Sequence, residues 1–118
     1  MNIVITTKNL ELTDQLNGLI NKKISGLKKF TKILKTDFQE VFIEVEKETR
    51  HHRKGDVFKA EAIITLPGRK LVARSHGENL SQVIIAMRDE LKREIRKYKT
   101  QTVELPRRKY RKLKKQTF

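Results

Sequence analysis

Residues 58–76 read FKAEAIITLPGRKLVARSH, and this stretch predicts two antiparallel strands joined by a tight turn. Apolar side chains alternate with others on both sides of Pro67-Gly68, which is typical of strands with one buried face. Pro presets φ and Gly accepts a positive φ, so this dipeptide suits the turn. The predicted buried-face positions are Phe58, Ala60, Ala62, Ile64 and Leu66 before the turn, and Leu71, Ala73 and Ser75 after it, in a strand over about residues 69–76.

Two further strands are predicted upstream of this hairpin. Alternation over about residues 39–48 places Val41, Ile43 and Val45 on one face, and β-branched residues predict a short strand over about residues 2–7. The polar, glycine-containing residues 49–56 predict a loop.

Two helices are predicted from apolar residues at helical spacing. Thr13 is a plausible N-cap for the first helix, which we expect to end before Asp37, and Asn79 can cap the second. Gly26 should weaken the first helix by about 1 kcal/mol relative to Ala. The apolar stripes comprise Leu16, Leu19, Ile20, Ile24, Leu27, Phe30 and Leu34 in the first helix, and Leu80, Ile84, Met87, Leu91, Ile95 and Tyr98 in the second.

The predicted fold is α+β, with the order β-α-β-β-β-α and a four-stranded sheet that has two helices packed on one face. The last three strands should be antiparallel, and the first can pair in parallel with the second through a helical crossover. We expect one domain over residues 1–100 and a basic tail over residues 101–118 that is disordered unless bound.

The formal net charge of +14, from 28 Lys and Arg against 14 Asp and Glu, indicates a polyanionic partner. Nucleic acid is the first candidate, an anionic membrane surface the second, and solubility alone the simplest alternative. Helical phase places basic residues opposite both apolar stripes, and it places Lys23 nearer the apolar edge of the first helix. In the second helix we expect an ion pair between Asp89 and Arg93. These basic residues are Lys22, Lys28, Lys29 and Lys32 in the first helix, and Lys92, Arg93, Arg96 and Lys97 in the second.

Several classes of function are disfavoured. The chain has no Cys, no signal peptide and no apolar run longer than residues 83–87, so we expect a cytoplasmic protein with no membrane partner. No phosphate-binding loop, nucleophile elbow or metal-binding helix motif occurs, so we expect no enzyme activity, cofactor or small-molecule substrate.

Two pairs of side chains leave alternatives open. His51 and His52 lie in a basic loop where phosphate contact or base stacking is more plausible than metal binding, since adjacent side chains on extended chain diverge. Phe42 and Phe58 could stack on bases, although core packing is the default expectation.

Residues 91–100, LKREIRKYKT, resemble the closing helix of the ribosome hibernation-promoting factor and ribosome-associated inhibitor family. In that helix a Leu, an Arg two residues later, and two Lys separated by an aromatic residue or His recur. Gly77 before the helix start at Asn79, and Lys23-Ile24-x-x-Leu27-x-x-Phe30, are similar to family patterns in the same register. The resemblance covers about residues 1–99. It implies a four-stranded sheet with two helices on one face, as in a double-stranded-RNA-binding domain.

The resemblance also implies binding to rRNA of the small ribosomal subunit, in the channel for mRNA and tRNA, with inhibition of translation. Position by position it implies RNA contacts by Lys23, Lys29, Arg93, Lys97 and Lys99. Our remaining RNA-binding candidates are Lys22, Lys28, Lys32, Arg74, Lys92, Arg96, Arg107 and Arg108. Without the second domain of long family members, we expect a monomer. A generic binder of structured or double-stranded RNA is the alternative.

The sequence departs from the family at four positions. Gly26 stands where a Lys is frequent, Ser81 where a Tyr is, Ile85 where an Asp is, and Glu90 where a Lys is. These differences bear on individual contacts rather than on the fold.

Overall fold

The computed structural model describes residues 2–29, 40–49, 56–66 and 68–101, and within them four strands form one mixed sheet. The strands are β1 (Asn2–Lys8), β2 (Glu40–Thr49), β3 (Asp56–Leu66) and β4 (Arg69–Gly77). Their spatial order is β1-β2-β3-β4, with β1 parallel to β2 and the other pairs antiparallel. The predicted strand pairing is therefore confirmed.

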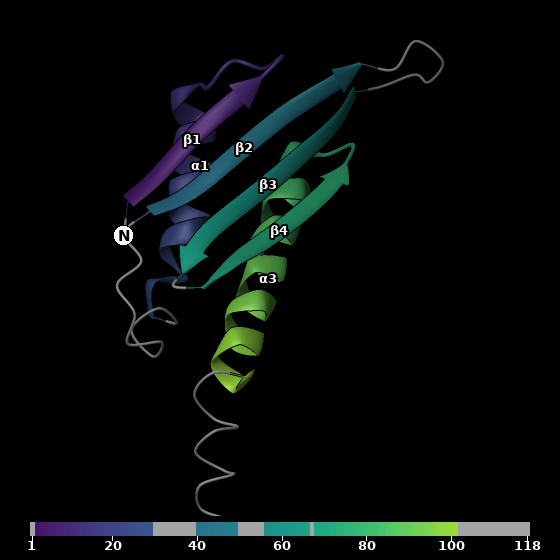
Figure 1. Cartoon of the computed structure of the whole chain (residues 1–118). Helices are drawn as coiled ribbons and strands as arrows, with labels where there is room; N and C mark the ends of the chain where they lie inside the picture. Colours follow the sequence, from purple (N-terminus) through teal and green to yellow (C-terminus); the bar gives the residue numbers. More distant parts are fainter. Residues whose placement is uncertain (1, 30–39, 50–55, 67, 102–118) are drawn as a thin grey trace, which may run out of the picture.

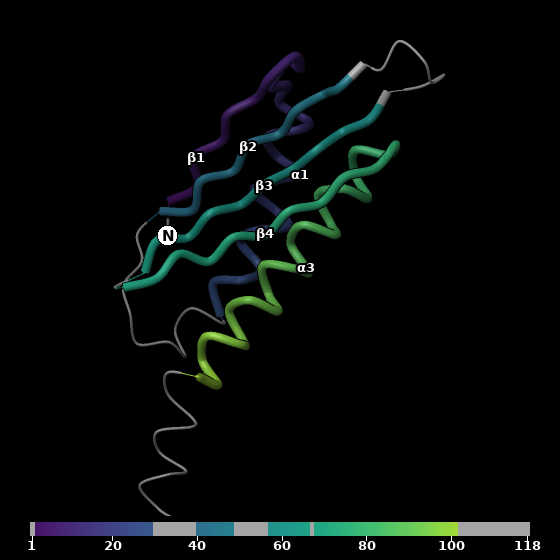
Figure 2. The backbone as a smooth tube through the Cα atoms, turned by 45° about the vertical axis from the view of Figure 1, so that its right-hand side comes forward, coloured from purple at the N-terminus to yellow at the C-terminus, as the bar shows by residue number. Residues whose placement is uncertain are grey.

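Two helices, α1 (Asp14–Ser25) and α3 (Leu80–Lys99), cover one face of this sheet and leave the other face open (Figure 1). The tube view in Figure 2 shows the same two-layer arrangement. The order β-α-β-β-β-α and the α+β class agree with the sequence prediction.

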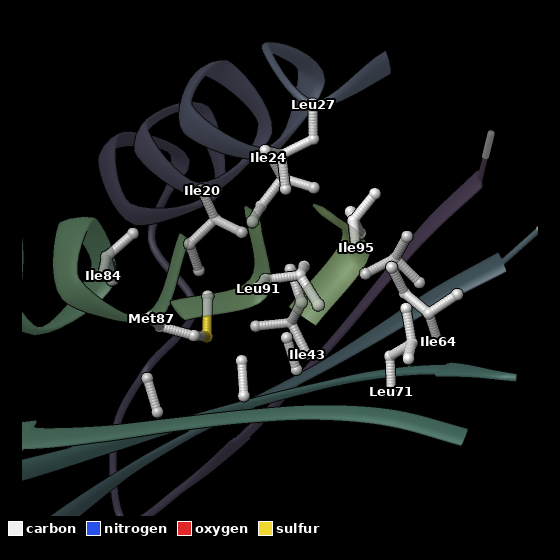
Figure 3. Close-up of a cluster of buried hydrophobic side chains, with 14 of the residues drawn as sticks. Ile20, Ile24, Leu27, Ile43, Ile64, Leu71, Ile84, Met87, Leu91 and Ile95 are labelled. Carbon is white, nitrogen blue, oxygen red and sulfur yellow. The ribbon is translucent and has the colours of Figure 1, made fainter. Parts of the chain in front are cut away.

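The core lies between the sheet and the two helices (Figure 3). From the sheet, Ile43, Ile64 and Leu71 point toward the helices, and the helices place Ile20 and Leu91 among them. Each such side chain stabilises the fold by about 1.5–3 kcal/mol when fully buried. Among the described residues no polar or charged residue is buried, so the layer between helices and sheet is entirely apolar.

Both predicted N-caps are confirmed. The Thr13 hydroxyl accepts a hydrogen bond from the Leu16 amide at 3.1 Å, and the Asn79 side chain accepts one from the Gln82 amide at 3.1 Å. Each bond satisfies a helix amide that has no partner within the helix. These contacts set where the two basic helices begin.

The first helix is shorter than its apolar stripe suggested. It ends at Ser25 with Gly26 as its C-cap, and Leu27 remains buried after the turn. Gly has the lowest helix propensity after Pro, which explains an end at this position. Residues 28 and 29 are helical again, while Phe30, Leu34 and Asp37 lie outside the described residues.

Two glycines meet specific requirements of the backbone. Gly68 has φ of 73°, as expected for the turn between β3 and β4. A Cβ at Gly77 would lie 3.2 Å from Val83 Cγ2, so the absence of a side chain lets α3 pack close to the end of β4. None of the helices in these described ranges is long and apolar enough to cross a membrane.

Candidate nucleic-acid interface

Helix α3 carries the largest group of predicted RNA-binding residues, which is five of the thirteen. The helix buries Leu91, Ile95 and Tyr98 against the sheet, and the intervening positions turn toward solvent. Of the candidates on α3, Arg93, Arg96 and Lys97 are exposed, while Lys92 and Lys99 are half-buried. The helical phase predicted from the sequence is therefore confirmed, and it places these cations on the side of α3 away from the core.

The end of α1 and the turn after it carry the second group of cations. Lys22, Lys28 and Lys29 are exposed, and Lys23 is half-buried, as expected for a side chain at the apolar edge. Residues 15–29 contain no Asp or Glu. Lys22 and Lys23 form no ion pair with any residue that the structure describes.

The two helices run in the same direction along the sheet, so their C-terminal ends lie toward the same end of the molecule (Figure 1). The last turn of α1 contains Lys22 and Lys23, and the last turn of α3 contains Arg96, Lys97 and Lys99. Cations at a helix C-terminus are stabilised by the helix dipole, each typically by about 0.3–1 kcal/mol. This arrangement concentrates positive charge at one end of the helical layer.

One predicted ion pair on α3 is wrong. Asp89 does not pair with Arg93; instead its carboxylate lies 2.9 Å from the Arg88 guanidinium. Arg93 pairs with Glu90 at 3.0 Å, one turn earlier. The longer Glu side chain spans the i,i+3 separation, while Asp89 is already engaged by its neighbour. Glu90 stands where the family frequently has Lys, so this departure partly neutralises an RNA-binding candidate.

Arg74 does not join this surface. Its neighbours on β4, Leu71 and Ala73, point to the helices, and Arg74 points from the opposite face of the sheet. There its Nε lies 2.5 Å from the Glu61 carboxylate, the residue directly opposite it on β3. Arg74 therefore lies on the opposite face of the sheet from the helix cations, and its contact with RNA stays a prediction.

Three other predicted RNA-binding residues, Lys32, Arg107 and Arg108, lie outside the described residues, as do His51 and His52. Within the described part of the chain, no group of three or more His, Asp or Glu side chains is placed to hold a metal ion.

Of the two aromatic residues considered for base stacking, only Phe58 packs against the core. Phe42 is 44% exposed on the open face of the sheet, so core packing, its default expectation, is wrong. Phe42 and Glu44 are two residues apart in β2, so their side chains share one face of the sheet. The charged Glu44 was therefore the signal in the sequence that this face is open to solvent.

Comparison with solved structures finds the same fold in other proteins. A ribosomal subunit interface protein from Coxiella burnetii aligns with a TM-score of 0.69 and 17% identity, covering 85% of this chain and 99% of that chain. The Protein Y N-terminal domain from Thermus thermophilus aligns with a TM-score of 0.62 and 22% identity, covering 83% of this chain and 99% of that one. A comparison with curated protein sequences gives no match.

The amino-acid sequence shows to which family the chain belongs. The profile described as sigma 54 modulation protein / S30EA ribosomal protein matches residues 3–103, which span all the strands and helices described above apart from the first residue of β1. The chain is therefore a member of the sigma 54 modulation protein / S30EA ribosomal protein family.

Proposed function

We propose that this protein binds rRNA of the small ribosomal subunit, in the channel that holds mRNA and tRNA, and inhibits translation there. The observation that supports the proposal most is the gathering of helix cations at one end of the helical layer. Lys22 and Lys23 have no carboxylate partner among the described residues, and Arg93 and Lys97 are exposed in the same layer. Membership of a family named for ribosomal proteins points to the ribosome as the polyanion.

The physical mechanism is neutralisation of phosphates. Each Lys or Arg that contacts a phosphate releases a condensed counterion, which makes binding favourable at low salt and weaker as salt rises. Occupation of the channel then excludes mRNA and tRNA by volume, so the protein needs no catalytic group. We propose that it acts in this way in the cytoplasm, as a monomer.

The test is co-sedimentation with purified small subunits, together with an in vitro translation assay. The variant Arg93→Glu/Lys97→Glu should sediment with small subunits at least about tenfold more weakly, because removing one hydrogen bond to a charged group costs about 1.5–3 kcal/mol. Inhibition of translation should weaken in parallel. The control variant Lys8→Glu/Lys70→Glu makes the same change in net charge on exposed strand residues and should bind as the wild type does.

A generic binder of structured RNA is the competing function. It is favoured by the fact that the cations lie on helices, with no aromatic stacking platform beside them in the described residues. Affinity for small subunits and for a plain RNA duplex, measured at one salt concentration, separates the two functions. Equal affinities, or equal loss of binding in the reversal and control variants, would contradict the ribosome-specific proposal.

A further inference from the structure

The face of the sheet that the helices leave open carries a row of apolar side chains across all four strands. Val4, Phe42, Ile63 and Val72 are register neighbours in β1, β2, β3 and β4. Phe42 is the most exposed of them, at 44%, and the other three are half-buried. Because Ile43, Ile64 and Leu71 are the strand neighbours of this row and point into the core, the row lies on the opposite side of the sheet from α1 and α3.

The next row on the same face places two carboxylates side by side. Glu44 in β2 lies directly opposite Glu61 in β3. Glu61 is engaged by Arg74, whereas Glu44 forms no ion pair with any described residue. Like charges directly opposite in a sheet are destabilising, and Arg74 offsets this repulsion only at Glu61. An added cation would relieve it.

Two shallow hollows meet at these carboxylates. One, of about 210 Å³, is lined by Val4, Phe42 and Ile63 together with Glu44 and Glu61. The other, of about 390 Å³, is also lined by Glu44 and Glu61, with Arg74 beside Glu61, and continues along the sheet to Lys59 and His76. The chemistry that fits is therefore a cation next to an apolar or aromatic group, in an extended segment.

Residues 107–115 of the same chain, RRKYRKLKK, have this composition, with seven Lys and Arg around Tyr110 and Leu113. The chain reaches this segment from the edge of the sheet. Arg69, the first residue of β4, donates a hydrogen bond from Nη1 to Gln101 Oε1 at 2.6 Å. Val72 lies three residues after Arg69 on β4, which corresponds to about 10 Å from Arg69 at about 3.3 Å per residue.

Residues 102–110 can span up to about 30 Å when extended, which exceeds the distance needed to cross from β4 to β2. A tethered segment also has an effective concentration in the millimolar range, an advantage that a free peptide or a second copy lacks.

We propose that residues 107–115 dock on the open face of the sheet in the same chain, with Tyr110 against the Phe42 row and Lys112 between Glu44 and Glu61. Alternate residues of an extended segment share one side, so Tyr110 and Lys112 reach the apolar row and the carboxylates together. The docking itself is independent of ribosome binding. Its consequence, competition between the sheet and rRNA for the tail, rests on the function proposed above.

The test is carbodiimide cross-linking of the purified full chain without RNA, with the linked peptides identified by mass spectrometry. A mixture of unlabelled and ¹⁵N-labelled protein distinguishes links within one chain from links between chains. The expected result is a link within one chain from Glu44 or Glu61 to Lys109 or Lys112. The pair Lys59–Glu48, whose charged atoms lie 2.9 Å apart, should link in every sample and reports that the chemistry worked.

A matched pair of variants tests the apolar contact. Phe42→Ser should lower the yield of the link between the tail and Glu44 or Glu61 several-fold, while both carboxylates remain in place. Leu12→Ser removes another exposed apolar side chain, 39% exposed and outside the sheet, and should leave the yield unchanged.

Three results would overturn the proposal: no tail link while Lys59–Glu48 forms, tail links only between chains, or an undiminished yield in Phe42→Ser. Because no RNA is present, each of these results leaves the ribosome-binding proposal to be judged by its own sedimentation test.

Discussion

The guanidinium of Arg69 lies over the ring of Tyr98, with its central carbon 5.8 Å from the ring centroid. Tyr98 is 8% exposed and is the last core residue of α3, while Arg69 opens β4. The same guanidinium binds Gln101, so one side chain joins the edge of the sheet to the end of the helix that carries the exposed cations. Arg69 therefore fixes the position of the basic end of α3 relative to the sheet.

Replacing Arg69 with Ala should destabilise the fold by about 1 kcal/mol, since an exposed cation–π contact contributes about 0.5–1 kcal/mol and a hydrogen bond a similar amount. Urea unfolding followed by circular dichroism measures the effect. Lys70→Ala removes the neighbouring exposed cation, for which the structure shows no such contact, and should change the unfolding free energy by much less. Equal effects in both variants would contradict a structural role for the Arg69–Tyr98 contact.

Replacing Glu90 with Gln should raise affinity for small subunits, by about 1.4-fold to fivefold. The carboxylate pairs with Arg93 at 3.0 Å, and its removal leaves the guanidinium available to a phosphate. An exposed ion pair is worth about 0.2–1 kcal/mol, which sets this range. Glu78→Gln, an equal change in charge at an exposed site before α3, is the control. A weaker interaction in Glu90→Gln, measured by sedimentation, would argue that Arg93 does not contact RNA.

Replacing Lys22 and Lys23 with Gln should reduce the dependence of small-subunit binding on salt. If both side chains neutralise phosphates, the slope of log affinity against log salt should fall by about one for each lysine replaced. Binding is measured between low and moderate ionic strength, with Lys8→Gln/Lys70→Gln as the matched control. An unchanged slope in the α1 variant would show that these two lysines contact no phosphate and only interact with the C-terminal end of α1.

Replacing Gly18 with Ala should stabilise the protein by about 0.5–1 kcal/mol, because Gly in a helix interior is less favourable than Ala by that amount. A Cβ at this position in α1 meets no atom within 4 Å, so no steric cost offsets the gain. Thermal unfolding measures the change. A lower melting temperature would mean that the surface of α1 near residue 18 is tightly packed in solution.

Replacing Gly68 with Ala should have the opposite effect. Its φ of 73° lies in the left-handed region, where an L-residue costs roughly 1–2 kcal/mol. A Cβ there also meets nothing within 4 Å, so the backbone conformation alone accounts for the loss of stability. The same unfolding measurement applies, and an unchanged stability would indicate that the turn readily adopts another conformation.

The strands and the second helix could be predicted from sequence because alternation and helical spacing there coincide with burial. Ala62 and Leu71 are buried on the sheet, and Met87 is buried on α3, at the positions that the two periodicities indicate. The end of α1 was harder to predict, since the apolar stripe continues through Leu27 while the helix stops at Ser25. Periodicity alone does not show where a glycine ends a helix.

The candidate site was predictable only in part for a related reason. Helical phase identifies the outward cations of α1 and α3, because that phase depends on residues close in sequence. The ion pair of Arg74 required knowledge of which residue lies across the strand. Strand alternation indicated the open face for Phe42, but its large apolar side chain made core packing the default expectation. The pairing of Arg93 with Glu90 rather than Asp89 depended on side-chain geometry, which residue spacing does not determine.

The common direction of the two helices has a consequence for the kinetics of association. Since the excess of Lys and Arg on both helices lies toward the same end and outweighs the partial negative charge of the two helix C-termini, its long-range field orients the protein before it touches a polyanionic partner. The encounter rate should then fall steeply as ionic strength rises, while the lifetime of the formed complex changes less.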